Sequence, residues 1–272
     1  MIRTRMRYHR PRSLEEASQV LLEHHGNAAV VGGGTFLLPR MTRHLLEYEH
    51  VVDLKDLGLR QITSTDGEIE IGASVSYVDV LESDLLRSNL ALLPRMARGI
   101  TGGRQITQQG TLVGAVCFHF PTTDAPGAVF ALDAMVDIHG PDGRRSVPIS
   151  DFLIDAFVVD LRPGEFVSSM RFAPQPSGGY CKVKHSTGSW PIVTASAVPG
   201  PGGSVRITLG AVESLPVVVT VEDPLDRTEL KHRVDSAITA PWSDVLAPGS
   251  YRADIAAAVA RRAVEDLMGV PK

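Results

Sequence analysis

Three consecutive glycines followed by a threonine, Gly32–Thr35, come directly after a short apolar segment. Glycines let successive backbone N–H groups turn inward and approach a ligand without interference from Cβ atoms, and the threonine hydroxyl adds a further donor. A loop of this kind after a strand is typical of an anion cradle. A plain strand-to-helix turn is the alternative. The spacing matches neither the Gly-x-Gly-x-x-Gly dinucleotide fingerprint nor the Gly-Lys-Ser/Thr phosphate loop.

A second stretch, residues 102–124, is also dense in small and hydroxyl-bearing residues, among them Gly110, Thr111, Gly114 and Thr123. This composition suits a backbone wrapped around a polar ligand. The stretch ends at Asp124, and an acid in a nucleotide site can accept a hydrogen bond from a ribose hydroxyl. An ordinary surface loop of the Ω type is the alternative here.

Other side chains that could do chemistry are scattered. None of the nine histidines falls in His-x-Glu or His-x-x-x-His spacing with a third ligand, so we expect no metal site. We interpret His24 and His25 as exposed residues at a helix end. His119, between two phenylalanines, either packs among aromatic rings or lines a pocket, and Tyr180 and Trp190 are further pocket candidates. No order of Ser, His and Asp indicates a nucleophile, so no catalytic residue is assigned.

Two cysteines occur in the chain, Cys117 and Cys181. Iron–sulfur clusters and zinc knuckles need about four ligands, so we expect neither in this chain. Cys117 lies among apolar neighbours, which indicates a buried and inert thiol.

The bulk composition bounds the protein class. The chain has 272 residues, 43% of them hydrophobic, which is enough for about two domains of roughly 100–200 residues each. A net charge of -4 without a basic run disfavours nucleic acid and membrane surfaces as partners. No apolar run reaches the roughly 18 residues of a transmembrane helix. The basic N-terminus leads into Tyr8-His9-Arg10-Pro11 rather than an apolar stretch, so we expect no signal peptide and a cytoplasmic protein.

Short elements must position the first glycine loop. Ser13 with acids at 15 and 16 predicts the start of a helix, and Gly26 lies where that helix would end. Strands are predicted at 28–31 and 50–54, with a helical turn at 36–39 between them. This order predicts a small α/β subdomain over residues 1–57.

The remaining chain has an α+β pattern. Over residues 58–175 we expect strands at 62–63, 68–72 and 135–138, helices at 77–86 and 90–96, and a long irregular loop at 99–127. Residues 174–179 are the clearest linker. A smaller α+β domain is expected over 176–272, with a hairpin turn at 199–203 and a final helix at 251–268. The predicted fold class is therefore α+β, with a two-part domain at 1–175 followed by the C-terminal domain.

Taken together, the two loops with their separation and flanks resemble the FAD-binding medium subunit of molybdenum hydroxylases. This is the family of xanthine dehydrogenase and aerobic carbon monoxide dehydrogenase. Residues 31–39 are similar to the family's Ala-Gly-Gly-Thr-Ser-Leu-Leu-Pro loop, which holds the FAD pyrophosphate. The resemblance covers nearly the whole chain and also rests on residues 8–17, 52–54, 71–73, 105–134, 180–182 and 251–263.

The resemblance implies a dehydrogenase subunit that binds FAD and passes electrons onward. Its implied partners are an iron–sulfur small subunit and a molybdopterin large subunit. The pyrophosphate is expected at Val31, Gly32, Gly33, Gly34, Thr35 and Phe36. The adenosine-diphosphate and ribitol side is expected at Gly110, Thr111, Gly114, Thr123 and Asp124, and Lys182 is expected near the flavin edge.

The second loop departs from the family pattern Arg-Asn-x-Gly-Thr-Ile-Gly-Gly-Asn. Val113 replaces the first of the paired glycines, and Ala115 replaces the asparagine that would contact the cofactor. Residues 185–191 also lose an acid that the family places near the flavin. These changes predict altered flavin chemistry, an altered partner or weaker flavin binding. Two alternatives therefore stay open: a stand-alone FAD-dependent oxidoreductase acting directly on a small molecule, and a flavin-free protein that kept the fold.

Overall fold

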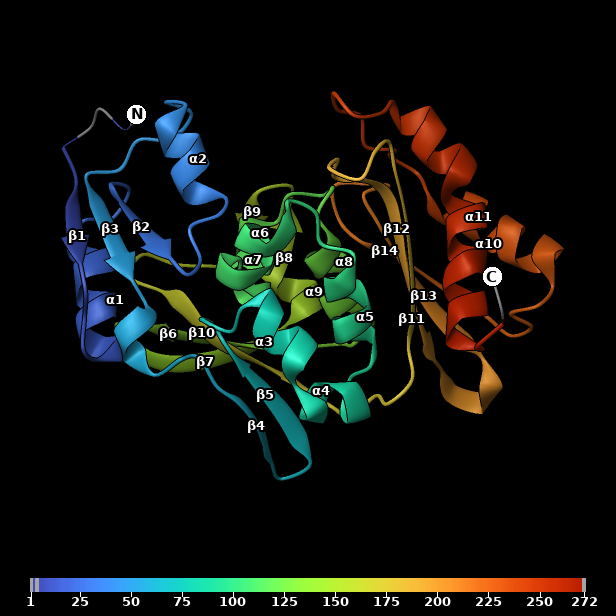
Figure 1. Ribbon diagram of the computed structural model, residues 1–272, viewed down its shortest axis with the longest axis horizontal. Helices are drawn as coiled ribbons and strands as arrows, with labels where there is room; N and C mark the ends of the chain where they lie inside the picture. Colours follow the sequence, from blue (N-terminus) through green and yellow to red (C-terminus); the bar gives the residue numbers. More distant parts are fainter. Residues whose placement is uncertain (1, 3–4, 271–272) are drawn as a thin grey trace.

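A computed structural model describes residue 2 and residues 5–270 of the chain (Figure 1). The expectation about a signal peptide concerns an N-terminal segment that lies partly outside these described residues. Within them, no helix is both long enough and apolar enough to cross a membrane.

Three parallel strands form a small sheet at the N-terminal end of the molecule, in the order β1-β3-β2 (Figure 1). The strands are β1 (Arg7–His9), β2 (Ala28–Val31) and β3 (His50–Asp53). Helix α1 (Leu14–Glu23) precedes β2, and helix α2 (Leu37–Thr42) lies between β2 and β3. A 3-10 turn, η1 (Lys55–Leu57), follows β3. The predicted helix start is confirmed, because the Ser13 hydroxyl accepts a hydrogen bond from the amide of Glu16. Since parallel strands run in one direction, the glycine loop after β2 and Leu54 after β3 lie at the same edge.

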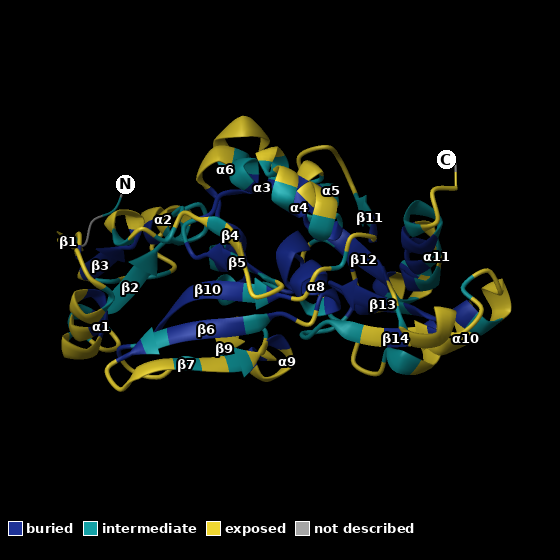
Figure 2. Cartoon of the chain, turned by 90° about the horizontal axis from the view of Figure 1, so that it is seen from below, coloured by how far each residue is buried: buried dark blue, intermediate teal, exposed yellow. Residues whose placement is uncertain are grey.

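A five-stranded antiparallel sheet forms the middle of the molecule, in the order β4-β5-β10-β6-β7. Figure 2 shows helices α3 to α6 gathered on one side of it. The strands are β4 (Ile62–Thr65), β5 (Glu68–Gly72), β6 (Met135–Gly140), β7 (Gly143–Pro148) and β10 (Phe166–Phe172). Helix α9 (Ile149–Phe152) and the small pair β8 (Leu153–Asp155) and β9 (Val158–Val159) connect β7 to β10.

The predicted irregular loop at 99–127 is wrong, because most of this stretch is helical. It contains α6 (Gly103–Gln109), α7 (Leu112–Phe118) and the start of α8 (Asp124–Ala131). Thr111 begins α7, since its hydroxyl accepts from the amide of Gly114 at 3.1 Å. Helices of seven or eight residues separated by glycine or proline are too short to show a repeating apolar pattern in the sequence.

The helix predicted at 77–86 is divided in two. α3 (Tyr77–Glu82) ends and α4 (Asp84–Asn89) begins at Ser83, whose backbone is extended and whose hydroxyl accepts from the amide of Leu86. A serine that caps the second helix therefore interrupts the first. The helix predicted at 90–96 is present as α5 (Leu92–Arg98).

The C-terminal region is a four-stranded antiparallel sheet covered by two helices. The strands β11 (Gly179–Lys184), β12 (Pro191–Pro199), β13 (Val205–Gly210) and β14 (Val217–Val221) follow one another in the sheet. The predicted hairpin turn is present as a short 3-10 turn, η2 (Pro201–Gly203). Helices α10 (Arg227–Ala237) and α11 (Gly249–Leu267) follow, and a Cβ added at Gly179 would lie 2.0 Å from the carbonyl of Ala263. β11 and α11 therefore touch at backbone distance.

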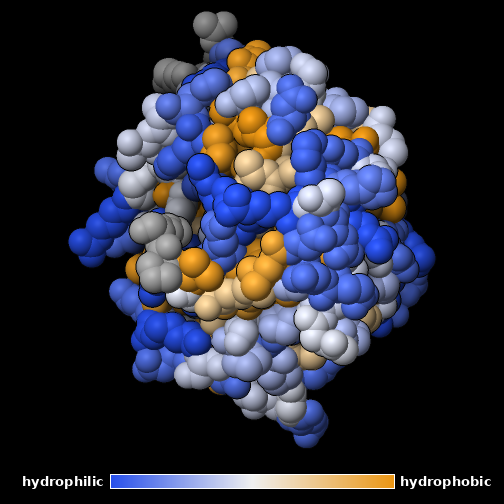
Figure 3. Space-filling model, turned by 90° about the vertical axis from the view of Figure 1, so that its right-hand side faces the viewer, coloured by the Kyte–Doolittle hydropathy of each residue, from blue (hydrophilic) through white to orange (hydrophobic). Residues whose placement is uncertain are grey.

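Buried apolar side chains form two clusters. The larger joins the first two sheets with α1, α3 to α5, α7 and α8, and also includes Tyr180 and Val198 of the C-terminal sheet. The smaller lies between the C-terminal sheet and helices α10 and α11. Seen from the end that carries α10 and α11, the surface is mostly hydrophilic, with apolar side chains in separate patches (Figure 3). The α+β fold class is confirmed: a two-part N-terminal region is followed by a smaller C-terminal α+β region.

Candidate functional site

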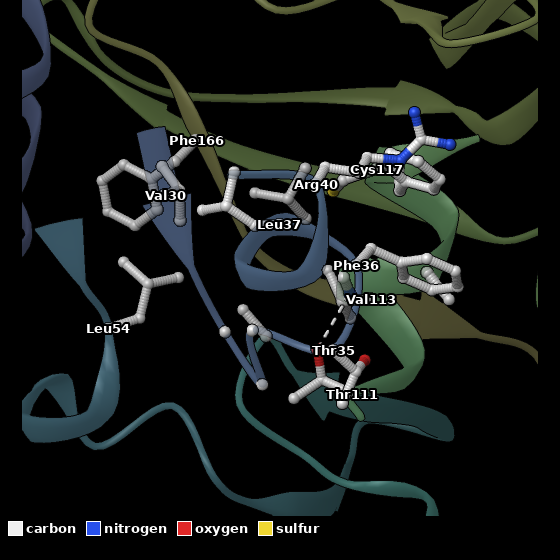
Figure 4. Close-up of a pocket in the computed structure, with 18 of the residues that line it drawn as sticks. Val30, Thr35, Phe36, Leu37, Arg40, Leu54, Thr111, Val113, Cys117 and Phe166 are labelled. Carbon is white, nitrogen blue, oxygen red and sulfur yellow. Dashed lines mark hydrogen bonds between the residues drawn. The ribbon is translucent and has the colours of Figure 1, made fainter. Parts of the chain in front are cut away.

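A cavity of about 430 Å³ lies at the edge where β2 and β3 end, and its walls come from the glycine loop, α2, α7 and β10 (Figure 4). This volume is within the range of cofactor sites. Both predicted loops contribute to its lining. The predicted site residues that line it are Gly32, Gly33, Gly34, Thr35, Phe36, Thr111, Gly114 and Ala115. Val113, which replaces a glycine of the family pattern, lines it too.

Close backbone approach brings the two loops into one wall. A Cβ at position 33 would lie 1.7 Å from the carbonyl oxygen of Gln109 and 3.0 Å from the Cα of Gly110. Gly34 has φ of +70°, a conformation that other residues rarely adopt. Glycine is therefore required at 33 by contact with the second loop and at 34 by the turn. Gly110, which does not line the cavity, is part of this contact.

The cavity wall presents hydrogen-bond donors. Among the described residues, the half-buried amides of Gly32, Gly33, Gly34 and Thr35 donate to no other protein atom. The Thr111 hydroxyl accepts from the Gly114 amide, which leaves its own proton available to a ligand. Half-buried backbone donors without a protein acceptor need water or a ligand. Several at one wall suit an anion such as a diphosphate.

Arg40 was missed by the sequence reasoning, although it comes one helical turn after Phe36. In the described part of the chain it is the only charged residue lining the larger cavity. Its guanidinium carbon lies 4.6 Å from the ring centroid of Phe118 and 5.4 Å from that of Phe157, which is cation–π distance. Burial lowers the pKa of Arg40, yet arginine stays charged at any physiological pH.

A second cavity, of about 260 Å³, adjoins the first, and Thr35 and Phe36 line both. Its other lining residues include Thr123, Asp124 and Trp190. The Phe36 ring stacks on Phe118 at 4.6 Å between centroids and meets Trp190 edge-on at 5.7 Å. The two cavities are thus separated by an aromatic group that includes Phe36.

A buried polar network closes one side of the second cavity. Oδ1 of Asp124 accepts from the Tyr180 hydroxyl at 2.5 Å and from the Lys182 ammonium at 2.8 Å. Burial, with Asp124 as a second cause, raises the pKa of Tyr180 well above its ordinary value. Because Asp124 begins α8 while its partners lie on β11, the network ties the C-terminal sheet to the cavity. The hydroxyl of the neighbouring Thr123 donates to the carbonyl of Phe120.

Several predicted site residues line neither cavity: Val31, Gly110, His119, Tyr180 and Lys182. His119 is 1% exposed and ends α7 with φ of +38°. Burial lowers its pKa to about 4, so its ring is neutral near pH 7. Cys117 is half-buried and lines the larger cavity, and burial raises its thiol pKa to about 12. That shift keeps the thiol protonated and unreactive.

The chain is similar to known proteins in both sequence and structure. Residues 4–175 match the family described as the FAD binding domain in molybdopterin dehydrogenase. The chain is 32% identical to the carbon monoxide dehydrogenase medium chain of Afipia carboxidovorans over 95% of both chains. It is also 32% identical, over 62% of this chain and 58% of the relative, to the xanthine dehydrogenase FAD-binding subunit of Escherichia coli O157:H7.

Solved structures show the same likeness. A chain of the reconstituted CO dehydrogenase from Oligotropha carboxidovorans superposes with a TM-score of 0.91 at 30% identity, over 100% of both chains. A chain of the carbon monoxide dehydrogenase from Hydrogenophaga pseudoflava gives 0.89 at 27% identity, over 99% of both chains. The described fold therefore matches these chains from end to end.

Proposed function

The chain belongs to the family of FAD-binding medium subunits of molybdenum hydroxylases, and on this premise we propose that it carries electrons from partner subunits to an external acceptor. Its cofactor is FAD, and it is a subunit of an FAD-dependent dehydrogenase complex. Bound FAD supplies the one- and two-electron redox chemistry, while the chain binds, orients and shields it. The observation that carries this proposal is the cavity walled jointly by Gly32–Thr35 and Thr111–Ala115.

The residues present fit this cofactor. We assign the FAD diphosphate to the amides of Gly32, Gly33, Gly34 and Thr35, because several adjacent N–H groups without a protein acceptor suit a doubly charged group. The Thr111 hydroxyl adds a donor beside Gly32, because a Cβ placed on Gly32 would lie 3.0 Å from the Thr111 hydroxyl oxygen. We assign the flavin side to the second cavity, which is lined by Asp124, the residue that the resemblance places on the ribitol side; Lys182 pairs with Asp124 from outside the cavity lining.

Electron transfer requires partners that hold the other redox centres. The names of the relatives, medium chain and medium subunit, support an assembly with a small and a large subunit. We propose that these carry iron–sulfur clusters and molybdopterin, since the two cysteines of this chain are too few for a cluster. We also propose domain limits of 1–175 and 176–272, supported by a second cluster of buried apolar side chains that lies entirely within 176–272.

The electron route is tested with the FAD-loaded chain. We expect co-elution with candidate small and large subunits in size exclusion, and bleaching of the flavin absorbance when those subunits are reduced by their substrate without oxygen. The chain alone should show no bleaching with the same substrate. Flavin that stays oxidised in the assembled complex would refute the route.

A stand-alone oxidoreductase is the second candidate function, favoured by one observation. The second cavity is separate, has about 260 Å³ of space beside Trp190 and Asp124, and adjoins the proposed FAD cavity. For this function FAD would fill only the larger cavity, and a small substrate bound in the second cavity would lie beside it. Turnover of a small molecule by the isolated FAD-loaded chain would support this function, whereas dependence of all turnover on the partners supports the first.

Replacing Arg40 with methionine is expected to weaken FAD binding by roughly 10- to 100-fold. We propose Arg40 as counter-ion to the diphosphate, and losing a charged interaction costs about 1.5–3 kcal/mol. Methionine keeps the apolar contact with Phe118. Fluorescence titration of the stripped chain with FAD measures the change. Arg43→Met is the matched control, because Arg43 is exposed at the end of the same helix and lines neither cavity. Equal affinity of the Arg40 variant and wild type would remove Arg40 from the site.

A further inference from the structure

Three histidines far apart in the sequence meet in the N-terminal subdomain, away from the FAD cavity. They are His9 at the end of β1, His24 at the end of α1, and His50 at the start of β3. The rings of His24 and His50 stack with centroids 3.5 Å apart, and those of His9 and His50 with centroids 5.1 Å apart. His24 ends α1 as expected, but it is half-buried rather than exposed, because its ring packs on His50.

The ring nitrogens are spaced as metal ligands can be. One nitrogen from each histidine lies within 4.8 Å of the others, and His9 Nε2 is 2.9 Å from His50 Nδ1. Nitrogens bound tetrahedrally to zinc at about 2.0–2.1 Å lie roughly 3.4 Å apart. Rotation of the half-exposed His9 and His24 rings would bring the three nitrogens to that spacing around the buried His50. Zinc in place of the proton between His9 and His50 would widen their separation by only about 0.5 Å.

We propose that His9, His24 and His50 form a binding site for a divalent transition metal of the zinc class. Neutral imidazole suits zinc, copper and nickel, whereas calcium and magnesium prefer oxygen ligands. His50 is 9% exposed and forms the inner wall, while His9 and His24 are half-exposed, which leaves the fourth coordination position to water. Burial is the main cause that lowers the pKa of His50, followed by His24, His9 and Arg7, while Glu49 opposes the shift.

The position of the three histidines indicates a structural role for the metal. The site joins a strand, a helix end and a second strand, so the metal would hold β1, α1 and β3 together. His50 is the first residue of β3, and the cavity residue Leu54 follows its last residue. None of the three histidines lines either cavity, although Tyr48, two residues before His50, lines the larger one. Metal binding should therefore stabilise the subdomain and leave the flavin unchanged.

The test is a zinc titration of the full FAD-loaded chain, stripped with chelator and followed by calorimetry and thermal unfolding. We expect one Zn²⁺ per chain and a Tm that rises by roughly 5–10 °C at a hundredfold excess over Kd. His9→Ala and His24→Ala should each weaken binding by at least about tenfold, since even outer-shell partners contribute 10- to 100-fold. His25→Ala is the matched control, because His25 is the exposed neighbour of His24 and should bind zinc like wild type.

Two results would overturn the proposal. One is the absence of stoichiometric zinc binding by the wild type. The other is wild-type zinc affinity in either the His9 or the His24 variant. Flavin absorbance and circular dichroism show whether each variant is folded, and His24→Asn is the replacement if His24→Ala is not. The flavin readout also keeps this test independent of the proposed electron route.

Discussion

Gly33→Ala is expected to lower FAD affinity by roughly 10- to 100-fold. The added Cβ would lie 1.7 Å from the carbonyl oxygen of Gln109, and both groups belong to the backbone. No side-chain rotation relieves such a contact, so the second loop must move away from the first. Overpacking of this kind costs about 1–3 kcal/mol, and here it displaces Thr111 and Gly114 from the cavity wall. FAD titration of the stripped protein measures the loss.

Gly67→Ala separates this effect from the general cost of replacing a glycine. Gly67 has φ of +83° in the β4–β5 turn, has no atom within 4 Å of an added Cβ, and lines neither cavity. It should lower stability through backbone strain and leave FAD affinity unchanged. If Gly33→Ala binds FAD as tightly as Gly67→Ala does, the two loops do not form the diphosphate site.

Arg252→Met is expected to lower the free energy of unfolding by about 3–5 kcal/mol, with little change in FAD affinity once the protein is folded. Arg252 lies on α11 and is fully buried. Its guanidinium donates to the carbonyls of Ile192 and Ala211 and pairs with Asp244 at 2.5 Å. Burial lowers its pKa, and Asp244 opposes that shift. Methionine fills the space but removes the guanidinium donor from two carbonyls and from Asp244, which keeps the amides of Leu246 and Ala247 as donors.

Urea unfolding followed by circular dichroism measures this loss, and Arg261→Met is the control. Arg261 lies on the same helix, is about one-third exposed and pairs with Glu265 one turn away. Such a pair contributes only about 0.3–0.5 kcal/mol, so the control should unfold almost like wild type. Equal stability of the two variants would show that Arg252 does not hold α11 to the C-terminal sheet.

Local sequence signals predicted those parts of the fold that neighbouring residues control. The Ser13 cap and the strands at 28–31 and 50–53 are present because a hydroxyl near a free amide and a short apolar run act within a few residues. The glycine loop was likewise recognisable, since its composition is unusual by itself. Its ordered place among other family segments then identified the family, which the comparisons confirm.

The stretch at 99–127 shows where local signals fail. Its helices are too short to repeat an apolar period. The stability of α7 and α8 comes from packing in the larger apolar cluster rather than from helix propensity, whereas α6 has no buried residue. Arg40 was missed for a related reason. Its charge matters because Phe118 and Phe157, more than 70 positions away in the chain, bring it to the cavity.

The sequence by itself determined the family, the cofactor and the loop that we assign to the diphosphate. A run of glycines is recognisable from a few adjacent residues, because its backbone freedom depends only on those residues. Only the tertiary structure decided why Gly33 is required, namely the backbone of a loop 76 positions later in the chain. It also decided that Asp124 pairs with Lys182 and that His9, His24 and His50 meet. Contacts between distant segments depend on how the sheets and helices pack, and no spacing along the chain records them.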